Sequence, residues 1–156
     1  MRLVVVAPGR PTHPAAIAWC ADFQERIARM VPFERRAGRA IRRTRAGVDA
    51  AARTKECDGI LELIPPQSHV VLLDVVGQGQ SSDQLLSWLT ARADQGVREI
   101  CCVLGGPDGV DDRVRARAQL RLSLSAMTLP HDLAEVVLLE QLYRALTRQK
   151  GLPYHR

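Results

Sequence analysis

The sequence contains no apolar run of about 18 or more residues, the length that a membrane-spanning helix needs. Its first segment, Met1–Gly9, is too short for a signal peptide and stops at a turn, so it predicts a strand. Hydrophobic residues make up 46% of the 156 residues, which is ordinary for a globular core and argues against disorder. We therefore expect one cytoplasmic domain spanning residues 1–156, with no membrane partner.

Metal-site and disulfide patterns are absent as well. The four cysteines show no CxxC spacing, and the sequence has no paired histidines. We therefore expect neither a metal site nor a disulfide framework. Two of the cysteines, Cys101 and Cys102, lie in an apolar run, where buried thiols act as small hydrophobic groups.

Common catalytic signatures are missing too. No P-loop, no G-x-S-x-G elbow and no H-E-x-x-H helix occurs, which disfavours the hydrolases and nucleotidases that carry them. Lysine is also scarce, since only Lys55 and Lys150 are lysines among 22 basic residues. Arginine instead clusters in residues 34–45, which hold six arginines and one acid. Guanidinium groups suit phosphate, so the cluster indicates either a polyanion partner or an ordinary solvated surface.

Strand-like and helix-like segments alternate, which predicts an α/β fold with a parallel sheet covered by helices on both faces. The expected strands cover residues 3–7, the neighbourhood of Phe33, 70–74, 100–104 and 120–124. The expected helices cover residues 14–30, 48–63, 81–94, 111–118 and 130–150. Apolar residues span about half the circumference of the last helix, which is broader than one packing face needs and predicts a partner chain.

Three loops follow the carboxyl ends of expected strands, and ligands of open α/β sheets collect at that edge. The loop Gly77–Gly79 is a weak signal because it lacks the G-x-G-x-x-G pattern. Gly105–Gly109 is more pointed, since glycines let backbone approach a ligand closely, although a plain turn is the ordinary alternative. His131 opens the last helix, where a neutral imidazole could accept a proton or simply pack. Arg144 lies one helical turn after Glu140, so an exposed ion pair between them is the ordinary explanation for Arg144.

Four phrases, in order and in spacing, resemble those of RlmH-type methyltransferases of the SPOUT superfamily. They are residues 104–109 (LGGPDG), 124–131 (LSAMTLPH), 142–145 (LYRA) and 153–156 (PYHR). The similarity also covers Met1–Gly9 and Leu73-Asp74 with Gly77, so it spans almost the whole chain. Two features depart from the pattern: Gln78 stands where relatives often carry lysine, and the arginine-rich stretch 35–45 replaces a more apolar second strand.

The resemblance implies a SPOUT-type parallel sheet flanked by helices, with a C-terminal trefoil knot, in a homodimer. It implies that S-adenosylmethionine binds in the knot, and that the target is N3 of a pseudouridine in helix 69 of 23S ribosomal RNA on assembled ribosomes. By position, the residues that match the cofactor pocket are Leu73, Gly105, Leu124, Ser125, Ala126, Met127, Thr128 and Leu129. Those that match the family's RNA-facing residues are His131, Arg144, Tyr154, His155 and Arg156.

We therefore expect an adenosylmethionine-dependent methyltransferase, in which the protein mainly aligns an already activated methyl group with the nucleophilic nitrogen. His131 and His155 are the candidates for removing the N3 proton. Arg144 and Arg156 could hold phosphate or a base edge, and Tyr154 could stack on a base. A non-catalytic ribosome-binding or assembly factor on the same fold is the main alternative. A small-nucleotide-binding protein is disfavoured because no phosphate loop is present.

Overall fold

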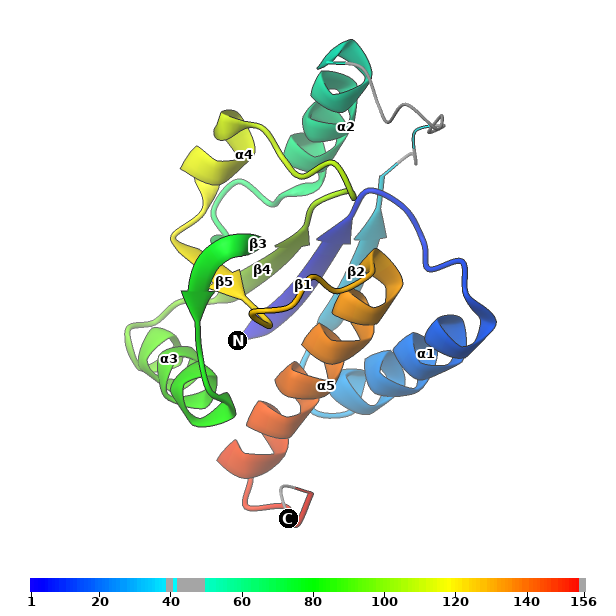
Figure 1. Ribbon diagram of the computed structural model, residues 1–156. Helices are drawn as coiled ribbons and strands as arrows, with labels where there is room; N and C mark the ends of the chain where they lie inside the picture. The colour runs from blue at the N-terminus through cyan, green and yellow to red at the C-terminus, as the bar shows by residue number, and fades with distance from the viewer. Residues whose placement is uncertain (39–40, 42–49, 155–156) are drawn as a thin grey trace.

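The computed structural model describes residues 1–38, 41 and 50–154. Strands and helices alternate along this part of the chain, as the sequence predicts. The elements are β1 (Arg2–Ala7), α1 (Pro14–Ala28), β2 (Phe33–Ala37), α2 (Ala50–Leu63), β3 (His69–Gly79), α3 (Ser82–Asp94), β4 (Glu99–Leu104), α4 (Asp112–Arg117), β5 (Leu120–Ser123) and α5 (His131–Gln149). All the strand pairs are parallel, and the sheet has the order β2-β1-β4-β3-β5 (Figure 1).

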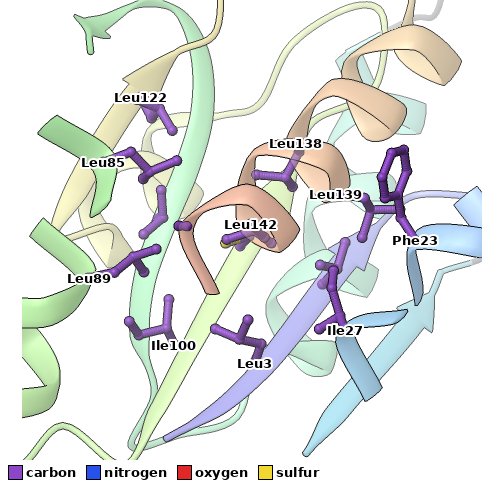
Figure 2. Packing of buried hydrophobic residues seen from close by; sticks show 14 of the residues in the cluster. Leu3, Phe23, Ile27, Leu85, Leu89, Ile100, Leu122, Leu138, Leu139 and Leu142 are labelled. Carbon is purple, nitrogen blue, oxygen red and sulfur yellow. The ribbon is translucent and has the colours of Figure 1, made fainter. Parts of the chain in front are cut away.

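The sheet is covered by helices on both faces. Helices α1, α3 and α5 lie over one face, and α2 with α4 lies over the other (Figure 1). Strands buried on both faces read as continuous apolar runs, which is why β1, β3 and β4 are rich in valine, leucine and isoleucine. Successive residues of one strand enter opposite cores: Cys102 packs with the α1–α3–α5 core and Cys101 with the α2–α4 core. Figure 2 shows the first core, with Leu142 of α5 between Leu89 and Phe23.

Both neighbouring cysteines are fully or almost fully buried, as expected for thiols that pack as small hydrophobic groups. Burial raises the pKa of Cys101 to about 12. Cys20 and Cys57 are buried as well. Among the described residues no group of histidine, cysteine and acidic side chains could hold a metal ion. No helix in that part of the chain is both long and apolar enough to cross a membrane.

The second strand forms despite its arginines. β2 pairs along its length with β1, from Leu3–Phe33 to Ala7–Ala37. It is an edge strand with partly exposed side chains, so it needs no apolar run. The arginines of β2 have acidic partners inside the protein: Arg35 pairs with Glu135 of α5, and Arg36 with Glu34. The rest of the cluster, residues 39–40 and 42–45, lies outside the described residues, as do the first two positions of the helix expected over 48–63.

β3 is longer than predicted and carries a bulge. It pairs with β5 at Leu73–Leu122 and again at Gln78–Leu122, so the intervening residues Asp74–Gly77 loop out of the ladder. Gly77 is required there because a Cβ would lie 2.7 Å from the carbonyl oxygen of Arg121. Asp74 holds the bulge from inside, since its carboxylate is 2.9 Å from the guanidinium of Arg121.

The broad apolar arc of α5 is largely explained within one chain. The helix packs on the sheet with α1 on one side and α3 on the other (Figure 1). Leu138, Leu139 and Leu142 are buried, and Val136 and Tyr143 pack at their edges. Leu133 is the exposed large hydrophobic residue of this helix. The width of the arc therefore does not by itself require a partner chain, and the homodimer stays a prediction.

Candidate functional site

A cavity of about 770 Å³ opens at the carboxyl edge of the sheet, where ligands of open α/β sheets bind. Its size falls in the range of small-molecule and cofactor sites. The bulged part of β3 and the loops that follow β4 and β5 form its walls, and the first turn of α5 closes one side. The lining comprises Leu73, Asp74, Val75, residues 104–110, Arg115, residues 122–125 and 127–131, and Ala134.

Most of the residues predicted to bind the cofactor lie in this lining. Leu73, at the end of the straight part of β3, forms one wall together with Gly105 from the loop after β4. From the loop after β5, Leu124, Ser125, Met127, Thr128 and Leu129 all reach the cavity. Ala126 is exposed and lies outside the lining, so the structure does not bring it to the cavity.

The glycine loop after β4 is a tight turn. The backbone N–H of Gly109 donates to the carbonyl of Gly106 at 2.9 Å, and Gly109 has a φ of 74°, a left-handed value that favours glycine. Gly105 is needed for packing: an added Cβ would lie 2.8 Å from Cγ1 of Val110. A side chain at Gly105 would therefore push on buried protein as well as on any ligand.

The loop after β5 is shaped by serine side chains. The hydroxyl of Ser123 donates to the carbonyl of Ser125 at 3.0 Å. The hydroxyl of Ser125 in turn accepts from the backbone N–H of Met127 at 2.9 Å. These local bonds hold the loop in an irregular path next to the cavity, where backbone groups outside regular structure can meet a ligand.

His131 lies in the cavity wall at the start of α5. Its Nδ1 is 3.1 Å from the carbonyl oxygen of Gly105. A carbonyl only accepts, so Nδ1 carries the hydrogen and donates it. With the hydrogen on Nδ1, Nε2 is the nitrogen left for other contacts, and that atom is buried without a hydrogen-bond partner in the described part of the chain. Buried polar atoms without a partner are uncommon in proteins, and this one belongs to a residue of the cavity wall.

Arg144 and Tyr154 meet each other at the far end of α5. The guanidinium of Arg144 lies 5.2 Å from the Tyr154 ring centre and donates to Glu140 at 2.6 Å. The hydroxyl of Tyr154 also donates to Glu140, at 3.3 Å, and its ring packs edge-on against Tyr143 with centres 4.7 Å apart. Burial, followed by the charge of Glu140, raises the pKa of Tyr154 above its usual value. Tyr154 is therefore packed on the protein, and its contacts contribute to the folded structure.

The predicted RNA-facing residues do not converge within one chain. Arg144 follows His131 by more than three turns of α5, which corresponds to about 20 Å along a helix. His155 and Arg156 lie outside the described residues. One chain thus holds two separate groups: His131 at the cavity, and the Glu140–Arg144–Tyr154 cluster at the other end of α5.

Two acids near the cavity escaped sequence reasoning. Asp74 is almost buried and pairs with Arg121 and, at 3.5 Å, with Arg115 in the cavity wall. Its sequence signal is an acid directly after a buried strand. Asp132 accepts from the backbone N–H groups of Thr12 and His13 at 2.8 and 2.9 Å. No local pattern links residues so far apart.

Comparisons with known proteins agree with this architecture. Residues 1–155 match the family model described as "Predicted SPOUT methyltransferase". The chain is 39% identical to "Ribosomal RNA large subunit methyltransferase H" of Gloeobacter violaceus over 155 residues, with 99% of both chains covered. Proteins of the same name from Anaeromyxobacter and Geobacter are 38% and 36% identical, with at least 99% of each chain covered.

A solved structure supports the fold. The crystal structure of tRNA (m1G37) methyltransferase from Aquifex aeolicus superposes with a TM-score of 0.55, covering 99% of this chain and 71% of that one. Its 17% identity speaks for the fold alone. The full-length match to the family model and the full-length relatives, together with a cavity at the carboxyl edge of the sheet, place this chain in the SPOUT methyltransferase family.

Proposed function

We propose that this protein transfers a methyl group from S-adenosylmethionine to large-subunit ribosomal RNA. The observation that carries the proposal is the cavity formed by the β3 bulge and the loops after β4 and β5, in a chain whose full-length relatives bear the name of such an enzyme. The finer target, N3 of a pseudouridine in helix 69 of 23S RNA in assembled ribosomes, rests on the resemblance of the four sequence phrases. An enzyme acting on ribosomes is expected in the cytoplasm.

The residues of the cavity suit S-adenosylmethionine. The wall is mostly apolar and backbone, with Leu73, Leu124 and Leu129 offering surface for an adenosine ring. The glycine loop Gly105–Gly109 lets main-chain groups approach the ligand. Once bound, S-adenosylmethionine supplies a methyl group activated by the positive charge of its sulfonium. The protein's remaining task is to align the acceptor nitrogen and handle its proton.

His131 is our candidate for the proton. Its Nδ1–H is committed to Gly105, so Nε2 is left as the acceptor. His131 is part of the cavity wall, and the RNA nitrogen that receives the methyl group beside the cofactor would need a base to remove its proton. His155 remains the other candidate.

A homodimer would bring the two separated groups together. If two copies of α5 ran antiparallel across a twofold axis, His131 of one protomer would face the Arg144 end of its partner. Exposed apolar side chains on α1 and α5 are available for contact with a partner chain: Trp19 is 55% exposed, Ile17 49% and Leu133 47%. Arg144 and Arg156 would then hold RNA phosphate or a base edge, and Tyr154 would stack on a base.

The knot is part of the same proposal. The chain segment from β4 to α5 would form a trefoil knot around the cavity, as the resemblance implies for the C-terminal third. Support comes from the strand order, in which the late strand β5 lies beside β3 rather than beside β4.

The test uses ribosomes from a strain that lacks this modification. Incubation with tritiated S-adenosylmethionine should label 23S RNA, and mapping should place the methyl group on one pseudouridine of helix 69. Labelling elsewhere would correct the target. Binding to ribosomes without any transfer would favour the alternative of a non-catalytic assembly factor.

A further inference from the structure

Most arginines in the described part of the chain have a partner inside the protein. Arg35 and Arg36 of the arginine-rich stretch are paired with acids. Others bind carboxylates, backbone carbonyls or an aromatic ring, as do Arg53, Arg92 and Arg117. Within the described ranges, Arg10 and Arg98 alone have side chains with no hydrogen bond, ion pair or ring contact. Both are exposed.

Arg10 lies in a short loop that is fixed to the cavity side of the molecule. The loop, Pro8–His13, follows β1, which is paired with β4 up to Val6–Val103. Its start therefore lies beside the start of the glycine loop at Gly105. Figure 1 shows the loop running past the first turn of α5 on its way to α1.

Two acids of α5 hold this loop on both sides of Arg10. The backbone carbonyl of Gly9 accepts from Arg35 at 2.6 Å, and Arg35 is itself bonded to the fully buried Glu135 at 2.6 and 2.9 Å. Beyond Arg10, Asp132 accepts from the backbone N–H groups of Thr12 and His13. Although partial burial opposes ionisation, these bonds lower the pKa of Asp132, so its carboxylate is committed to the loop.

From this placement we infer that Arg10 binds a backbone phosphate of the RNA substrate and helps to dock it over the cavity. The inference rests on the proposed function. A free guanidinium offers five donors, and no side-chain carboxylate competes for those of Arg10. Because the loop is held at Gly9 and at Thr12, little backbone freedom is lost when the phosphate binds. Asp132 directly follows His131 in the sequence. The same turn of α5 therefore both lines the cavity and fixes the loop.

The experiment compares Arg10→Gln with the matched control Arg98→Gln. Arg98 is equally exposed and unpartnered, but it directly precedes β4 and so lies at the opposite edge of the sheet. Both variants change the net charge by the same amount. Michaelis constants for ribosomes are measured between about 50 and 200 mM salt, together with cofactor affinity by calorimetry.

Arg10→Gln should raise KM for ribosomes severalfold at low salt, with kcat and cofactor affinity unchanged. The slope of log(kcat/KM) against log salt should become shallower by about 1, so the defect shrinks about fourfold over that range. Arg98→Gln should behave as wild type. Equal slopes for Arg10→Gln and wild type would overturn the inference. A change in the oligomeric state measured by light scattering would also overturn it, because it would assign Arg10 to a contact between copies.

The two proposals can fail separately. If wild type transfers no methyl group, the proposed function fails, but filter binding of the three proteins to ribosomal RNA still measures the salt slope. A difference there between Arg10→Gln and Arg98→Gln supports the phosphate contact, and its absence refutes it.

Discussion

Nδ1 of His131 lies 3.1 Å from the carbonyl oxygen of Gly105, which joins the start of α5 to the loop after β4. The bond fixes both the ring orientation and the tautomer, and Nε2 is buried without a hydrogen-bond partner among the described residues. Structural and chemical roles of this histidine therefore belong to different nitrogen atoms, and mutations can separate them.

His131→Asn should keep the structural role and remove the chemical one, because an asparagine amide can donate from near the position of Nδ1. We expect cofactor affinity within about twofold of wild type and a fall in kcat of about 10²–10⁴-fold, typical of a lost general base. Single-turnover methyl transfer and calorimetry measure the two effects. His69→Gln, remote from the cavity, is the control. Normal turnover in His131→Asn would show that another group removes the proton, and His155 would be the next candidate.

Substitution of Gly105 should act through Val110. Gly105→Val adds a side chain that starts 2.8 Å from Cγ1 of Val110, and overpacking of this kind costs about 1–3 kcal/mol. We expect a lower Tm and loss of S-adenosylmethionine binding. The double variant Gly105→Ala with Val110→Ala should recover the Tm and most of the binding. If the double variant folds normally and still fails to bind, the backbone at Gly105 meets the ligand directly.

The ion pair of Arg35 and Glu135 should be costly to break on one side only. Glu135 is fully buried, so Glu135→Leu leaves the charge of Arg35 without its acid, at a cost of about 3–5 kcal/mol. Replacing both, with Arg35→Met and Glu135→Leu, should restore the stability to the wild-type level or above. Urea unfolding of the two variants measures the difference. If the single and the double variant had the same free energy of unfolding, water would have to reach the ion pair.

Shortening the tail should separate packing from function. Removal of residues 155–156 should leave the Tm near wild type and reduce methyl transfer by about 10²-fold or more, since positioned groups are lost. Removal of Tyr154 as well also deletes its ring contact with Tyr143, which is worth about 0.5–1.5 kcal/mol. The Tm should then fall by several degrees. Normal turnover without residues 155–156 would remove them from the active site.

The proposed dimer predicts a mass twice the 17.3 kDa of one chain in light scattering at micromolar concentration. Leu133 is the exposed large hydrophobic residue of α5, the helix that would cross its partner in the proposed dimer, so Leu133→Asp should give monomers. Monomers should lose transfer while retaining cofactor affinity, because the cavity lies within one chain. Arg98→Asp is the control. A monomeric wild type would contradict the arrangement directly.

The sequence predicts the parts of the fold whose signal is local. Buried parallel strands such as Ile100–Leu104 are continuous apolar runs, and the structure places a strand there, Glu99–Leu104. The cavity lining could be predicted because the loops that follow such strands share one edge of the sheet, and because the four phrases resemble a known family.

Other features depend on partners far away in the chain. Nothing near Arg35 in the sequence shows that its charge pairs with Glu135. A strand within the arginine-rich stretch therefore could not be distinguished from a solvated loop. The bulge in β3 depends on Leu122 pairing twice, and Gly77 is its only local sign. Arg10 escaped notice because a solitary cation becomes informative only once the other arginines have found partners.

The pairing of β1 also sets the order in which this protein can acquire its shape. Leu3 pairs with Phe33 on one side and with Ile100 on the other, and among the five described strands no two neighbours are joined by a hairpin. Sheets built from such distant pairs fold slowly, because long loops close before any contact rewards them. During synthesis, the centre of the sheet cannot be completed until β4 has emerged. The cavity cannot be completed until the start of α5 has emerged. The binding site is therefore among the last features to form, and a cofactor cannot template the earlier steps.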